Sequence, residues 1–129
     1  MSLAAAVVRL TAADLRRMPP PALTPPDCAC ATLVCAGWES VSAPPGEPLL
    51  RHCGSLRDAT DEDPTLTELH ESGTRYESPG APIAPAWFPF NRCEVWACRH
   101  CGRGFLQYTE FGGYYVDHRL RQVDPQWVR

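Results

Sequence analysis

The sequence contains no lysine, and all 12 of its basic side chains are arginines. This absence does not exclude anion recognition, because the arginine guanidinium binds carboxylate and phosphate groups in a bidentate way. The codon bias of a GC-rich genome is the simpler explanation for the absence of lysine. The net charge is −3, with six arginines against eleven acidic residues in 1–89 and six against four in 90–129. A negative balance argues against a protein dedicated to nucleic-acid binding.

Long hydrophobic runs are also absent. No segment approaches the roughly 18 consecutive apolar residues of a membrane span. The apolar residues 1–8 lack a basic start and run into Arg9 and Asp14, so they make a poor signal peptide. We therefore expect a cytoplasmic protein that does not contact membranes. In that compartment thiols stay reduced, and clustered cysteines bind metal more often than they form disulfides.

The familiar catalytic and nucleotide-binding motifs are missing as well. The chain has no Ser-His-Asp order, P-loop, G-x-G-x-x-G motif, EF-hand loop or H-E-x-x-H spacing. The sequence therefore gives no sign of the hydrolase, nucleotidase, dehydrogenase and metalloprotease chemistries that these motifs carry. We predict that the protein is not an enzyme.

Proline, by contrast, is abundant, with 14 residues. Because proline lacks an N–H and interrupts helices and central strands, much of the chain must be loop. The length of 129 residues fits a single domain, 1–129. Within it we distinguish a helical, proline-rich part (1–48), a loop-rich connection (49–92) and a β meander (93–123).

Two helices are predicted in the first part. Residues 11–17 place Thr11 at the N-cap position and an acidic residue three positions later, which is a capping pattern. Residues 27–37 place Asp27 before an apolar stretch, and Gly37 where a helix-terminating glycine belongs. A strand is the alternative for 27–37, since a short buried apolar run suits either structure.

The connection contains two more structured segments. A short strand is predicted at 49–56. Residues 78–91 are rich in proline and aromatic residues, so we expect an extended strap whose Trp87, Phe88 and Phe90 pack on the core.

The last third has the most regular pattern. Strands are predicted at 93–98, 105–110 and 114–123, and Gly112 and Gly113 are expected to supply positive φ angles in the second turn. The sequence thus predicts an α+β fold, with N-terminal helices packed on a C-terminal three-stranded antiparallel meander.

The most specific motif is C-R-H-C-G, at residues 98–102. A Cys-x-x-Cys in a tight turn brings two sulfurs to one metal ion, and the glycine after it lets backbone N–H groups hydrogen-bond the sulfurs. With a strand on each side, the motif resembles the zinc-ribbon or rubredoxin-type knuckle over about residues 93–121, although the chain has no second Cys-x-x-Cys. The last third is also similar to that of short bacterial proteins with no assigned function, which implies no activity. We predict a Zn²⁺ site that contains Cys98 and Cys101.

Zinc takes four ligands, preferably thiolates or imidazoles. Cys93 reaches the knuckle only if the chain bends after it, because five extended residues span about 16 Å, and the proline-rich approach makes a bend plausible. His70 lies in a polar segment that gives it no other role. We predict the ligand set Cys93, Cys98, Cys101 and His70.

Three other residues stay open as replacements for His70 or Cys93. Cys53 is the first substitute, and His52 and His118 follow. Cysteine also serves as a small apolar core residue. We interpret three cysteines in this way: Cys28, Cys30 and Cys35.

A thiolate-rich zinc site is normally closed, and a closed site is structural rather than catalytic. The predicted function is a zinc-stabilised small binding or adaptor protein with a protein partner. One alternative is a nucleic-acid-binding zinc ribbon, because aromatic residues interleave with arginines in the last third. A second alternative is a thiol oxidoreductase that uses Cys98 and Cys101, because C-R-H-C resembles the C-x-H-C dithiol of thioredoxin-like disulfide isomerases. That family requires a helix after the motif, whereas this sequence favours a strand.

Overall fold

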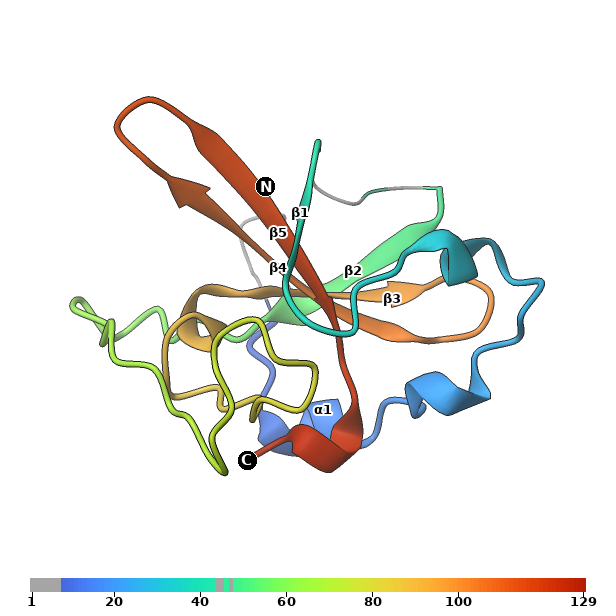
Figure 1. Cartoon of the computed structure of the whole chain (residues 1–129), viewed down its shortest axis with the longest axis horizontal. Helices are drawn as coiled ribbons and strands as arrows, with labels where there is room; N and C mark the ends of the chain where they lie inside the picture. Colours follow the sequence, from blue (N-terminus) through green and yellow to red (C-terminus); the bar gives the residue numbers. More distant parts are fainter. Residues whose placement is uncertain (1–7, 44–45, 47) are drawn as a thin grey trace, which may run out of the picture.

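Five antiparallel strands form one sheet in the computed structural model, which describes residues 8–43, 46 and 48–129 (Figure 1). The strands are β1 (Glu39–Val41), β2 (Leu50–Ser55), β3 (Glu94–Cys98), β4 (Gly104–Phe111) and β5 (Val116–Gln122). Their order across the sheet is β1-β5-β4-β3-β2. The three strands predicted in the last third are therefore the centre of a larger sheet, to which β1 and β2 add the two edges.

Helical structure is slight in the part of the chain that the structure describes. It consists of the α-helix α1 (Ala12–Arg16) and the 3₁₀ turns η1 (Pro21–Leu23), η2 (Ala29–Thr32), η3 (Phe90–Arg92) and η4 (Pro125–Trp127). The predicted α+β class, with N-terminal helices packed on a three-stranded meander, is wrong: the fold is mostly β. None of the described helices has the length and apolar character that crossing a bilayer requires.

Residues 27–37 form neither the predicted α-helix nor the alternative strand. Only Ala29–Thr32 turn, and Cys28 before them is extended, with φ −69° and ψ 139°. In an α-helix, side chains two residues apart point about 200° from each other. Here the Sγ atoms of Cys28 and Cys30 both lie beside the β3–β4 turn. Contacts with the sheet thus override the local helical pattern.

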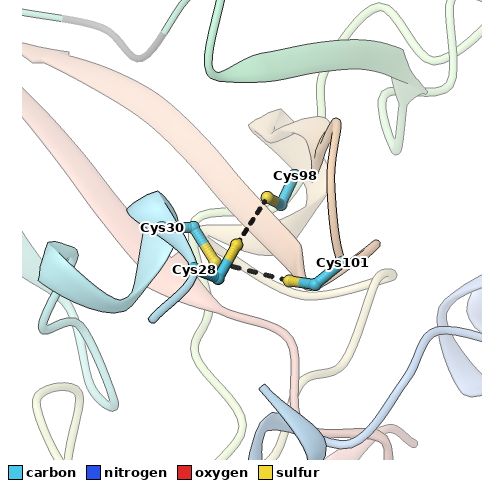
Figure 2. Close-up of side chains that lie close together, drawn as sticks. All are labelled: Cys28, Cys30, Cys98 and Cys101. Atoms are coloured by element: carbon cyan, nitrogen blue, oxygen red, sulfur yellow. Dashed lines mark hydrogen bonds between the residues drawn. The ribbon is translucent and has the colours of Figure 1, made fainter. Parts of the chain in front are cut away.

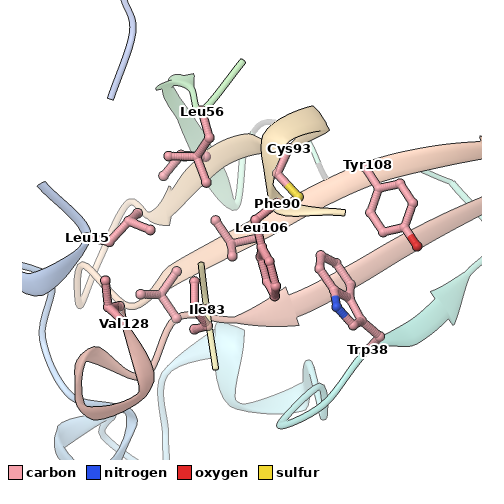
Figure 3. Packing of buried hydrophobic residues seen from close by; sticks show 11 residues of the cluster. Leu15, Trp38, Leu56, Ile83, Phe90, Cys93, Leu106, Tyr108 and Val128 are labelled. Atoms are coloured by element: carbon pink, nitrogen blue, oxygen red, sulfur yellow. The ribbon is translucent and has the colours of Figure 1, made fainter. Parts of the chain in front are cut away.

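One face of the sheet carries the main hydrophobic core (Figure 3). Leu15 of α1 and Ile83 are fully buried there against residues of β3 and β4. The strap predicted at 78–91 contributes Phe90, whose ring lies 5.8 Å from that of Trp38. Phe88 packs at the margin of this core. The strap therefore covers the sheet in place of the helices that the sequence pattern favoured.

The opposite face carries a smaller core. Its buried members are Cys30, Cys35, Leu50, Cys98, Phe105 and Leu120. The segment 28–35 contributes two of them, and the carbonyl of Cys35 accepts a hydrogen bond from the backbone N–H of Gln122 at 2.8 Å. The segment is thereby fixed against the end of the sheet where β3 turns into β4.

The β4–β5 hairpin extends beyond the rest of the sheet, at the upper left of Figure 1. Its turn differs from the expectation, because Gly112 and Gly113 are not among the described residues with positive φ. Gly112 instead lets the Tyr115 ring pack close to the backbone: a Cβ built there would lie 2.1 Å from this exposed ring, which would have to move. Tyr114, the first residue of the strand predicted at 114–123, lies before β5 in the turn and is fully exposed.

Candidate metal centre

The turn between β3 and β4 has the geometry of a metal-binding knuckle. Cys98 ends β3, and its carbonyl accepts a hydrogen bond from the Gly102 N–H at 3.0 Å. Gly102 has a φ of 82°, in the left-handed region that favours glycine. The backbone N–H of His100 points at the Cys98 Sγ atom, 3.4 Å away. These are the features that the C-x-x-C-G spacing predicts.

The second half of the site comes from the segment before β1. Cys28 and Cys30 flank the start of η2, and both side chains reach the knuckle (Figure 2). The Sγ atoms of Cys28 and Cys98 lie 3.5 Å apart, as do those of Cys30 and Cys101. All four sulfurs lie within 4.8 Å of one another. The site therefore joins two segments that are about seventy residues apart in the chain.

The donor set fits a tetrahedral thiophilic metal ion. A zinc ion with four sulfur ligands at about 2.3 Å separates those sulfurs by about 3.8 Å, which lies within the range that the four Sγ atoms span. Cys30 and Cys98 are buried, while Cys28 and Cys101 are partly exposed. Four cysteines placed in this way can hold one metal ion with no open position.

Arg103 holds the two halves of the site together. Its guanidinium donates hydrogen bonds to the carbonyls of Cys30 at 2.8 Å and Leu33 at 3.0 Å, and to the Gln122 side chain at 2.7 Å. The group also lies over the Phe105 ring, 4.7 Å from its centre. Arg103 is 7% exposed, so a buried cation lies beside the sulfur cluster and fixes the segment that carries Cys28 and Cys30.

Three of the four thiols have shifted pKa values. Burial raises the pKa of Cys30 to about 12. Burial acts in the same direction on Cys98, but hydrogen bonds from the backbone N–H groups of Cys101 and His100 outweigh it and lower the pKa of Cys98 to about 6. Burial also raises the pKa of Cys101. Cys98 is thus the sulfur that the protein best prepares as a thiolate.

The structure does not bring Cys93 or His70 to this cluster. Cys93 is fully buried in the main core, where its thiol donates to the Pro89 carbonyl at 3.3 Å, and burial raises its pKa well above the ordinary value. β3 follows it as a regular strand, so the chain makes no bend that carries Cys93 toward Cys98. His70 lies 2.9 Å from the carboxylate of Glu68.

The replacements considered for these ligands also lie outside the cluster. His52 contacts Glu94 at 2.7 Å, and His118 contacts the Thr109 hydroxyl at 3.0 Å. Cys53 packs at the edge of the main core. The predicted knuckle residues are therefore joined by two cysteines that the sequence pattern had assigned to the core.

The Cys-x-Cys spacing of Cys28 and Cys30 could have indicated a metal-binding role, although the residues around them are apolar. A Cys-x-Cys spacing places two thiols on one side of the chain only when the backbone between them is not α-helical. Two prolines, Pro25 and Pro26, stand within the six residues before Cys28 and weaken the case for a helix. Interpreted as loop, the segment would have offered two donors, the number that the knuckle needs.

Comparisons with known proteins do not identify the chain. No protein family, curated protein or solved structure that we compared matches it. The four-cysteine cluster is compatible with the zinc-knuckle resemblance, but that resemblance therefore has no family match behind it.

Proposed function

We propose that Cys28, Cys30, Cys98 and Cys101 bind one zinc ion as a closed structural site. The observation that carries this proposal is the convergence of four Sγ atoms within 4.8 Å of one another. Tetrahedral sites with four sulfur ligands are typical of zinc or iron. Zinc is favoured because it is the usual occupant of structural Cys₄ sites.

A structural role follows from the number and origin of the ligands. A catalytic zinc keeps one position for water or substrate and has three protein ligands. Here the protein supplies four thiolates, and Arg103 fixes the backbone of the segment that carries two of them. The zinc ion would join the segment 28–35 to the sheet and stabilise the smaller core.

The rest of the molecule supports a binding role over catalysis. In thioredoxin-like disulfide isomerases a helix follows the dithiol, whereas β4 begins three residues after Cys101. Three arginines of the last third are engaged within the protein: Arg103 and Arg121 are buried, and Arg119 pairs with Glu110 and Asp117. We propose a zinc-stabilised binding module whose partner is a protein.

Elemental analysis combined with thiol titration tests the metal site. The purified protein should contain one zinc ion per chain, and a chelator should release it and expose four additional reactive thiols. Co²⁺ in place of zinc should give the intense visible bands of a tetrahedral thiolate site.

Single substitutions assign the ligands. Cys28→Ser and Cys98→Ser should each weaken zinc binding by orders of magnitude, because each leaves three thiolates. Cys53→Ser, which alters a cysteine outside the cluster, is the matched control and should leave the zinc content unchanged. Protein that contains no metal, or zinc that is held equally well by Cys28→Ser, would contradict the proposal.

A further inference from the structure

The β4 strand has an open edge near its end. Backbone groups alternate between the two sides of a strand, and the Gly104 carbonyl accepts from the Val123 N–H on the β5 side. Odd-numbered residues of β4 therefore face the β3 side. The β3–β4 pairing stops at Gln107, so the N–H and C=O groups of Thr109 and Phe111 have no strand partner among the described residues. An open edge of this kind is a template for a further strand.

A groove runs along this open edge. It consists of two adjoining hollows of about 370 and 670 Å³ that share Arg57, Arg92 and Glu94. Thr109 and Phe111 line the smaller hollow. Phe111 is 77% exposed, and it adds apolar surface at the far end. We call this the β4 groove.

Of the three arginines that line the β4 groove, Arg9 pairs with Asp58 at 3.8 Å, whereas Arg57 and Arg92 lack acidic partners. Neither guanidinium forms an ion pair with any residue that the structure describes. The Arg57 side chain is exposed. Arg92 donates to the Pro64 carbonyl at 3.1 Å and lies over the Phe88 ring, which fixes it in the wall of the groove.

The carboxylates that line the same groove are already engaged. Glu94 lies 2.7 Å from the His52 ring. Asp58 accepts hydrogen bonds from the backbone N–H and the hydroxyl of Thr60, at 3.0 and 2.6 Å. Asp61 accepts from the Asp63 N–H at 3.0 Å. Two cations without ion-pair partners therefore lie beside an open strand edge.

We propose that the β4 groove binds an extended peptide that carries a carboxylate. The peptide would pair with Thr109 and Phe111 as an added strand, which is an established mode of peptide recognition. Its carboxylate would contact Arg57 and Arg92, which suit planar anions. A nucleic acid is disfavoured because it offers no backbone that pairs with a strand. A second copy of the chain is disfavoured because its own edge offers no free carboxylate to the arginines.

The test uses the full-length, zinc-loaded protein and a defined probe. The probe is a seven-residue peptide of alternating threonine and valine with one central aspartate and capped ends. Its neutral twin has asparagine at the centre. In amide NMR titrations the aspartate peptide should shift the Thr109 and Phe111 signals saturably, and the asparagine peptide should bind about tenfold more weakly, since charge-assisted hydrogen bonds are the stronger ones.

Two substitutions separate the parts of the β4 groove. Arg57→Glu should weaken the aspartate peptide about tenfold, while Arg75→Glu, the same charge change on an exposed loop outside the groove, should leave binding within twofold. Thr109→Pro removes one open N–H and should abolish strand pairing. It removes no backbone hydrogen bond between β4 and β5, but it also removes the side-chain bond from Thr109 to His118, so Thr109→Val, which keeps the N–H, is its control. Circular dichroism and zinc content verify that each variant is folded.

Four outcomes would overturn the proposal. The first is the absence of any saturable shift with the aspartate peptide, and the second is equal affinity in Arg57→Glu. The third is binding of a thymidine oligonucleotide with the same Arg57 dependence and a steep salt slope, which would assign the groove to nucleic acid. The fourth is a concentration-dependent dimer that shifts the same amide signals without peptide, which would assign the edge to a second copy.

Discussion

At the scale of single residues, Arg103 shows how one side chain joins two parts of the chain. Its three hydrogen bonds reach the carbonyls of Cys30 and Leu33 and the side chain of Gln122. The bond to Cys30 is buried and the other two are partly buried, while Arg103 itself is 7% exposed. Hydrogen bonds to a charged group contribute more than neutral ones, because an uncompensated buried cation would be costly. Arg103 therefore positions the Cys28–Cys30 half of the four-cysteine cluster.

Arg103→Lys should destabilise the zinc-loaded protein by about 3 kcal/mol, because a lysine ammonium cannot keep the forked contacts. Urea unfolding at neutral pH measures this loss. Arg51→Lys, an exposed position on β2, is the control and should change stability by less than about 0.5 kcal/mol. A lysine variant as stable as the parent would show that the three hydrogen bonds of Arg103 are not needed for stability.

Gly102→Ala should destabilise the protein by about 1–2 kcal/mol, because a φ of 82° disfavours any residue with a Cβ. The new Cβ would meet nothing closer than a Pro19 carbon at 3.4 Å, so the cost lies in the backbone and not in a clash. Gly113→Ala is the matched control, since its φ is not positive and its Cβ would meet nothing within 4 Å. Equal thermal stability of the two variants would contradict this explanation.

The knuckle was predictable from residues 98–102 alone, because its chemistry is local: two cysteines, a turn and one glycine. The partners were not predictable in the same way. Cys28 and Cys30 stand in a run that suits a buried helix or strand equally well, and their donor role depends on contacts about seventy residues away. His70 was predicted as a ligand because no local pattern gave it another role, and Cys93 because a bend could bring it to the knuckle. In the structure His70 contacts Glu68, and Cys93 lies in the main core.

At the scale of elements, an aromatic network ties a loop to the sheet. The hydroxyl groups of Tyr76 and Tyr108 hydrogen-bond each other, and Tyr76 also accepts from Arg119 at 2.8 Å. Trp38 lies against both tyrosine rings. Burial is the main reason that the pKa of each tyrosine is raised, and Arg119 opposes it while Glu110 adds to it. The network is stable only while both phenols keep their protons.

This network predicts a loss of stability at alkaline pH. The folded state holds the two phenol protons more tightly than the unfolded chain does. The contribution of the network to folding stability is therefore complete below the ordinary tyrosine pKa of 10.0, and it falls as the pH rises above that value. Tyr108→Phe should therefore lose less stability than the parent between about pH 9 and about pH 11. Urea unfolding over this range measures the difference. Tyr114→Phe, at the exposed hairpin turn, should behave like the parent.

Strands were predicted better than helices, for a physical reason. β2, β3, β4 and β5 alternate or cluster β-favouring residues over lengths that make them recognisable, whereas β1 has only three residues and pairs across 77 or more positions with β5. The helix expected at 27–37 does not form, because helix propensity is weak beside the burial of Cys30 and Cys35 against the sheet and the contacts of Cys28 and Cys30 with the knuckle. Hydrophobic periodicity reports the local preference of a segment, whereas the conformation of residues 27–37 is determined by their contacts with the sheet.

At the scale of the whole molecule, the proposed metal site acts as a cross-link. It joins Cys30 to Cys101, which are separated by 71 positions. A cross-link that closes a loop of this length removes about 4 kcal/mol of conformational freedom from the unfolded chain in the chain-entropy description. The metal would therefore stabilise the entire sheet and not only the turn that holds it.

Removal of the metal should lower the melting temperature by about 10–15 °C, the shift that about 4 kcal/mol produces in a domain of this size. Differential scanning calorimetry before and after chelation measures it, and added zinc should restore the original value. Cys28→Ser should melt at the lower temperature with or without the chelator. A melting temperature that does not change when the metal leaves would contradict the cross-link.

The order in which the ribosome delivers the cysteines has a consequence for synthesis in the cell. Cys30 emerges 71 positions before Cys101, and at about 5–20 residues per second this interval lasts roughly 4–14 s. During that time the thiols of Cys28 and Cys30 lack the two cysteines of the knuckle, and they are exposed to oxidants and to adventitious metals. A nascent chain that stalls within the interval exposes an unfinished sulfur cluster, so on the proposed function the supply of metal and the speed of translation would both affect the yield of folded protein.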